Sequence, residues 1–131
     1  MDTNLTEFVN EWISIANEDL RWAKASLDDG FYSRVCFVCQ QVAEKSLKGF
    51  LYGNNVQEKT HSLLHLMDMC AKKNSDFLEL KNELAVLDSY YIQTRYPDIG
   101  DIDRFNKSEF AQEAISAAEK VLAFVIKKIP E

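Results

Sequence analysis

A chain of 131 residues can bury one continuous core but is short for two. Hydrophobic residues make up 47% and charged residues 27%, a balance that excludes disorder as the main state. The formal net charge of -6 repels phosphate backbones, so we do not expect RNA as a partner. Residues 1–131 are therefore expected to form a single domain.

The composition also limits the fold class and the compartment. Only four Gly and two Pro are present, whereas a many-stranded β fold would need more turn residues. No apolar run approaches the roughly 18 residues of a membrane span, and the N-terminal residues are acidic where a secretion signal would be basic. We expect an all-α protein of the cytoplasm with no membrane contact.

Helical periodicity is first visible in two long segments. Apolar residues recur every three or four positions over about 6–28, where Asn4 and Thr6 compete as the helix N-cap. Gly30 can adopt the left-handed conformation that closes a helix. A second helix over about 31–53 should then return antiparallel to the first.

Three further helices are predicted after a polar loop. Thr60 is expected to cap a short helix over 61–72, and a fourth helix is expected over 76–95. Pro97 ends the fourth helix because the residue before a proline avoids helical backbone angles. Ser108 is expected to cap the last helix. The short connections predict an up-and-down bundle of about five helices.

The second helix is the segment around which the core is expected to form. Gln40 lies at the edge of its apolar side, so its amide should be half-buried and need a partner from a neighbouring helix. Glu44 lies four residues before Lys48, the favourable order for an ion pair, on a face that we interpret as solvated. Cys36 and Cys39 have the spacing of a redox motif but fall on the apolar side, which predicts reduced, buried thiols.

The string Arg95-Tyr96-Pro97-Asp98 follows Tyr91 and Asp88 near the end of the fourth helix. Side chains one and two turns apart share a helix face, where the guanidinium could grip a phosphate or a carboxylate. Alternatively, Arg95 neutralises the carbonyl end of the helix and pairs with the nearby aspartate. Spacing alone leaves both interpretations open.

His61 and His65 are four residues apart, the spacing with which a helix presents two imidazoles to zinc. Residues 62–64 are Ser, Leu and Leu, so the glutamate of a His-Glu-x-x-His motif is absent, and no third ligand is evident. We expect no metal and no cofactor. His61 is better explained as a residue at the start of a helix that donates to a carboxylate or a carbonyl.

Four separated motifs resemble a known family. They are Glu18-Asp19-Leu20, Phe31-Tyr32 with Gln40 to Lys48, His61 with Leu63 or Leu64 and Leu66, and Tyr91 with Arg95-Tyr96-Pro97-Asp98. Their order and spacing are similar to those of the HEPN domain (higher eukaryotes and prokaryotes nucleotide-binding), over about residues 15–126. The resemblance also implies a bundle of about five helices.

The resemblance implies a function as well as a fold. Small stand-alone HEPN proteins are commonly homodimers, are often encoded beside a minimal nucleotidyltransferase in toxin-antitoxin-like or nucleotide-transfer modules, and have been proposed to bind nucleotides. Carried over to this chain, the residues of the nucleotide or phosphate site are Lys45, Lys48, His61, Tyr91 and Arg95.

Other branches of the family are ribonucleases, in which four to six residues separate an Arg from a following His. Here the positions after Arg95 are Gly100, Asp101 and Ile102, and both histidines of the chain precede Arg95. The resemblance therefore implies a non-catalytic subunit. The alternatives are a divergent ribonuclease that uses Arg95 with His61, and a pure protein-interaction module.

Overall fold

The computed structural model of the protein describes residues 3–91 and 106–129. In these ranges there are five α-helices, one 3-10 helix and no strand, which confirms the predicted all-α, up-and-down bundle. The elements are α1 (Thr3–Leu27), α2 (Tyr32–Gly53), α3 (Leu63–Ala71), η1 (Ser75–Leu80), α4 (Lys81–Asp88) and α6 (Ser108–Lys128). None of the described helices is long and apolar enough to cross a membrane.

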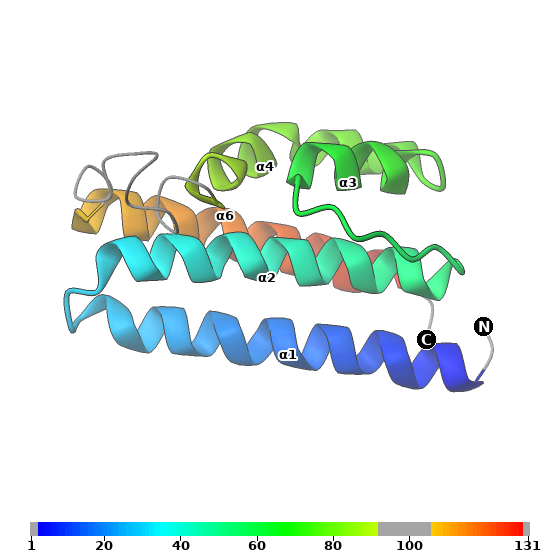
Figure 1. Ribbon diagram of the computed structural model, residues 1–131, viewed down its shortest axis with the longest axis horizontal. Coiled ribbons are helices and arrows are strands. Elements are labelled where there is room, and N and C mark those ends of the chain that lie inside the picture. The colour runs from blue at the N-terminus through cyan, green and yellow to red at the C-terminus, as the bar shows by residue number, and fades with distance from the viewer. Residues whose placement is uncertain (1–2, 92–105, 130–131) are drawn as a thin grey trace.

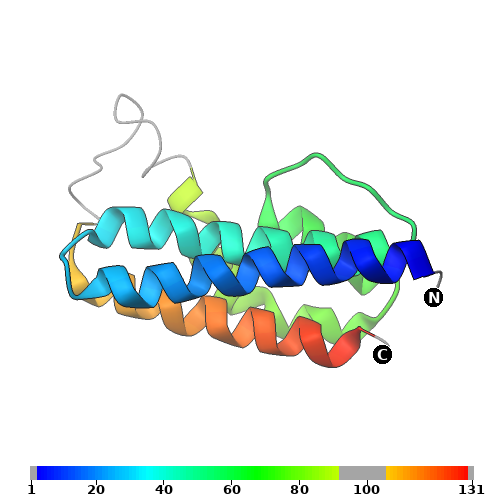
Figure 2. The ribbon, with the colours of Figure 1, turned by 90° about the horizontal axis from the view of Figure 1, so that it is seen from below.

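Three long helices form one layer and the short helices cover it. α1 and α2 run side by side with α6 behind them, and α3 and α4 lie across the opposite side of α2 and α6 (Figure 1). Seen from below, α1 lies in front of α2 and α6, which also pack against each other (Figure 2). α2 is therefore covered by α1 on one side and by α3 and α4 on the other, which makes it the central element of the core.

The turn between α1 and α2 contains Gly30 in the left-handed conformation, as predicted. Gly30 has a φ of +81°, in the left-handed region that a side chain would disfavour. The start of α1 differs from the prediction, since the helix begins at Thr3 and takes Asn4 and Thr6 into its first turns. Tertiary packing explains the difference, because the ring of Phe8 packs on Tyr52 of α2 and holds these turns in place.

The predicted caps of the later helices are also corrected. Ser62, and not Thr60, is the N-cap of α3, and its hydroxyl accepts from the backbone N–H of His65. The expected fourth helix begins as η1, which Asn74 caps, and continues as α4. α6 already begins at Ser108, after an N-cap residue that makes no side-chain cap bond. The caps of α3 and α6 lie within two residues of their predicted positions, where propensity alone cannot choose among several polar side chains.

The two longest helices approach closely at a glycine. A Cβ atom placed on Gly49 of α2 would lie 3.0 Å from the Cβ of Trp12 on α1. On the other side of α2, Phe77 packs against Phe50, with ring centroids 4.5 Å apart, and against Phe124 of α6, at 5.1 Å. The core is continuous from α1 through α2 to the short helices.

The three cysteines lie in this core, as predicted for Cys36 and Cys39. All three are free and buried. Burial raises the pKa of Cys36 and of Cys70 to about 12, and it raises the pKa of Cys39 as well. Since the thiolate is the reactive form, these side chains are packing residues.

We expect the folded protein to react with no equivalent of the thiol reagent DTNB at pH 8, and the protein in guanidinium chloride to react with three. The same pKa shifts make the free energy of unfolding fall as the pH rises above 9, because the unfolded thiols release protons that the folded thiols keep. Rapid labelling of one thiol in the native protein would contradict this assignment.

Candidate functional site

A nearly buried carboxylate on α2 is the centre of the site. Glu44 accepts from Lys48 Nζ at 2.9 Å, from Gln40 Nε2 at 3.3 Å and lies 3.0 Å from His61 Nδ1. The side chains of Glu44 and Lys48 are only 13% and 12% exposed. We call these four residues, together with Tyr91, the Glu44 cluster.

Helix geometry explains half of this arrangement. Gln40, Glu44 and Lys48 are spaced four residues apart and therefore lie on one face of α2. The ion pair between Glu44 and Lys48 that the sequence predicts is confirmed, but the face is not solvated as expected. The loop between α2 and α3 runs back along this face and brings His61 onto the carboxylate.

Gln40 ties the loop to α2. Its amide is fully buried, so the expected half-burial is an underestimate. Its Nε2 donates to the backbone carbonyl of His61 at 3.2 Å as well as to Glu44, so the partner comes from a loop and not from a neighbouring helix. The Oε1 atom of Gln40 finds no hydrogen-bond partner in the described ranges.

His61 is oriented from two sides. Its Nδ1 lies against the Glu44 carboxylate, and its ring stacks on that of Tyr91 with centroids 5.0 Å apart and an interplanar angle of 15°. A carboxylate partner favours the proton on Nδ1, which leaves Nε2 as an acceptor in the neutral imidazole. The side chain is 52% exposed, so this second nitrogen can be reached from solvent.

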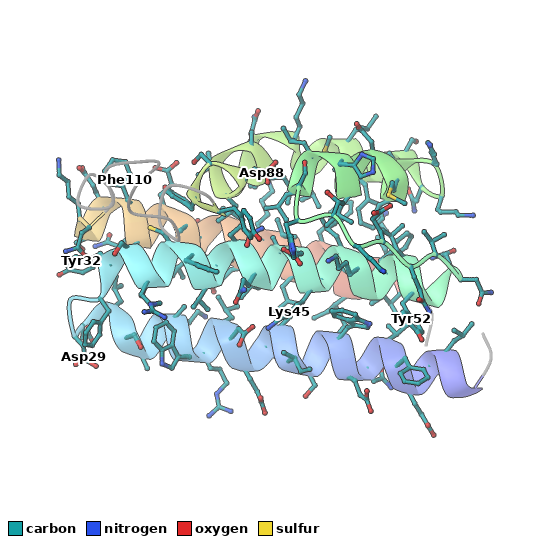
Figure 3. All side chains as sticks on the ribbon, viewed as in Figure 1. Asp29, Tyr32, Lys45, Tyr52, Asp88 and Phe110 are labelled. Carbon is teal, nitrogen blue, oxygen red and sulfur yellow. The ribbon has the colours of Figure 1, made fainter. Side chains whose placement is uncertain are left out.

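Asp88 determines where α3 begins. Its carboxylate accepts from the backbone N–H of Leu63 at 2.9 Å and of Leu64 at 3.4 Å, and it lies 3.5 Å from the hydroxyl of Ser62. Figure 3 shows Asp88 on α4 beside the start of α3. The sequence placed Asp88 on one helix face with Tyr91 and Arg95. In the structure, the first turn of α3 takes up the carboxylate of Asp88.

Lys45 lies apart from the cluster. Its ammonium forms an ion pair with Asp19 of α1 at 2.5 Å, and Figure 3 shows it between α2 and α1. Of the five residues of the implied site, the structure brings together Lys48, His61 and Tyr91. Arg95 lies outside the described residues.

The two histidines face different carboxylates. His61 lies on Glu44, whereas His65 Nε2 is 3.9 Å from Glu58. Over 3–91 and 106–129, no group of three or more His, Cys, Asp or Glu side chains could hold a metal ion.

The sequence did not predict the roles of two residues of the site. These are Glu44 as its centre and Asp88 as the cap of α3. A signal for Glu44 existed, since a residue four positions after a buried Gln40 and four before Lys48 must lie on the same partly buried face. No signal pointed to the contact of Asp88, which lies 25 residues from the N–H group that it caps.

Comparisons with known proteins agree with this fold. The family model of the HEPN domain matches residues 9–129, so the chain belongs to the HEPN domain family. The crystal structure of TT1696 from Thermus thermophilus is 37% identical, covers 92% of this chain and 98% of its own, and superposes with a TM-score of 0.80. ST0689, an archaeal HEPN homologue, is 31% identical over 93% of this chain and 98% of its own, with a TM-score of 0.76. No curated protein matches the chain.

The substitution Glu44→Ala should lower the free energy of unfolding by about 2–4 kcal/mol, because it leaves the nearly buried ammonium of Lys48 without its anion. Glu119→Ala is the matched control. It removes an exposed ion pair with Lys24 and should cost less than about 1 kcal/mol. Urea denaturation of both variants measures the difference, and equal midpoints would contradict the central role of Glu44.

Proposed function

We propose that this chain is a non-catalytic HEPN subunit that binds the phosphate group of a nucleotide at the Glu44 cluster and pairs with a minimal nucleotidyltransferase. The observation that supports it is the meeting of Lys48 and His61, 13 positions apart in the sequence, on the same carboxylate. A pair of this kind would serve a toxin-antitoxin-like or nucleotide-transfer module in the cytoplasm.

The charges of the cluster suit a phosphate. Glu44 offsets the charge of Lys48, so a net positive charge on the three side chains of Lys48, Glu44 and His61 requires that a phosphate binds together with a proton on the imidazole. The side chains of Lys48 and His61 are held in place before a ligand arrives, since they share Glu44 and His61 also stacks on Tyr91. Such pre-organisation reduces the entropy that binding would otherwise cost.

One observation favours a second candidate, a divergent ribonuclease. The contact of Glu44 with Nδ1 of His61 is the arrangement that orients a histidine for proton transfer through Nε2. In that case Arg95 would stabilise the charge of the transition state. The absence of a His that four to six residues separate from Arg95 is the reason to rank this candidate second.

The outer face of α1 supports pairing with another protein chain. Phe8, Ile15 and Trp22 recur every seven residues and are 46%, 45% and 43% exposed. A spacing of seven places them along one side of the helix, and exposed large apolar residues in a row are typical of contact surfaces. A second copy of the chain in a homodimer, or the transferase, would cover this row.

The nucleotide part is tested by titration calorimetry with ATP. We expect the wild-type protein to release or absorb heat, and His61→Ala to bind at least about tenfold more weakly, because it removes the exposed imidazole. His65→Ala is the control and should bind as the wild type does. Circular dichroism checks that each variant is folded, and the lack of any heat at millimolar ATP would remove the nucleotide from the proposal.

Incubation of the same proteins with tRNA distinguishes the ribonuclease from the non-catalytic subunit. We expect no cleavage by the wild-type protein. Cleavage that both His61→Ala and Arg95→Ala abolish would establish the ribonuclease instead, because a contaminating nuclease would act equally in all preparations.

The oligomeric state tests the contact surface on α1. Light scattering after gel filtration should give the wild-type protein twice the 15.1 kDa mass of the chain. Ile15→Glu should give the monomer, because it places a charge in the apolar row, whereas Ser14→Glu on an exposed position of the same helix should not. A dimer that survives Ile15→Glu would assign the contact to another surface, and a monomeric wild type would remove the homodimer.

A further inference from the structure

A cavity of about 340 Å³ lies next to the Glu44 cluster. Its walls come from α1, from the last turns of α2 and from the loop that leads to His61. The residues that matter for the argument are Trp12, Lys48, Tyr52, Gln57, Glu58 and Lys59. Figure 3 shows Tyr52 near the end of α2 that faces α1.

Two aromatic side chains form walls of this cavity, and each packs against a residue of the neighbouring helix. Tyr52 packs against Phe8, with ring centroids 5.3 Å apart. Trp12 is seated against Gly49, where any larger residue would meet its Cβ atom. Aromatic walls of this kind bind flat, unsaturated rings, and stacking on them is tolerant of which base is bound.

Polar groups complete the lining on the side of the loop. Lys48 belongs both to the cavity and to the Glu44 cluster, and Lys59 forms no ion pair with a carboxylate in the described ranges. Glu58 is held by the backbone N–H groups of Thr60 and Lys59, which lower its pKa and keep it ionised. The cavity thus joins an apolar, aromatic part to the side chains of Lys48, whose ammonium pairs with Glu44, and of Lys59, and to one fixed carboxylate.

The size and the chemistry define one class of ligand. A volume of about 340 Å³ is within the range of small-molecule sites, and aromatic walls beside the ammonium of Lys59 fit a flat ring that carries an anionic group. The loop also places Lys59 two residues before His61, so a ligand in the cavity would have its anionic end near the Glu44 cluster.

We propose that this cavity holds the base of a nucleoside phosphate against Trp12 and Tyr52, while its phosphates extend toward Lys59 and His61. This inference rests on the proposed function and adds to it the part of the site that recognises the base. Lys48 is the shared residue, since it lines the cavity and its ammonium lies on Glu44.

The chain offers a built-in reporter for the test, because it has two tryptophans and only Trp12 lines the cavity. Trp22→Phe leaves Trp12 as the sole indole, and Trp12→Phe leaves the exposed Trp22. With excitation at 295 nm, ATP should quench the fluorescence of Trp22→Phe in a saturable manner and should leave that of Trp12→Phe without a saturable change.

Calorimetry with two probes, ATP and tripolyphosphate, separates the base from the phosphates. Trp12→Ala should weaken the binding of ATP by about tenfold or more and leave the affinity for tripolyphosphate unchanged, since only ATP has a base to stack. Lys59→Ala changes an exposed residue and should weaken the binding of both probes. The control Lys81→Ala also changes an exposed lysine and should weaken the binding of neither.

The outcomes distinguish this inference from the proposed function. If ATP binds with equal affinity to the wild type and to Trp12→Ala, and Trp12 is not quenched, the base lies elsewhere and the cavity assignment is overturned while nucleotide binding stands. If neither ATP nor tripolyphosphate binds to the wild type, the nucleotide part of the proposed function fails, and the cavity assignment fails with it.

Discussion

The carboxylate of Glu44 is nearly buried, and a buried charge is costly unless charged and hydrogen-bonding partners surround it. Two partners, Lys48 and Gln40, come from the same face of α2 and are in place once the helix forms. The third partner, His61, belongs to the loop after α2. The loop must therefore return along α2, and Gln40 secures it there through the carbonyl of His61.

The path of the loop sets the position of the following elements. α3 starts two residues after His61, and the carboxylate of Asp88 caps its first N–H groups, so α4 must lie beside this start. Tyr91 follows Asp88 by three residues, and its ring covers His61. A single satisfied charge on α2 thus connects the central helix to both short helices, and the same contacts that stabilise the fold orient the exposed imidazole.

Lys48 links the two parts of the proposed site. Lys48 belongs to the Glu44 cluster through its ammonium and also lines the aromatic cavity. Membership of the HEPN domain family agrees with the bundle, and the proposed binding role depends on the half-exposed imidazole of His61.

The sequence by itself determined the features that depend on neighbours a few residues away. Helical periodicity predicts α1, α2 and α6, and a spacing of four predicts the pair of Glu44 with Lys48, because one helix decides both. Only the tertiary structure decided that His61 meets Glu44 and that Asp88 caps α3, across 17 and 25 residues of sequence. Such contacts depend on the path of a loop whose local preferences are weak, and burial of the core and of one charge selects that path.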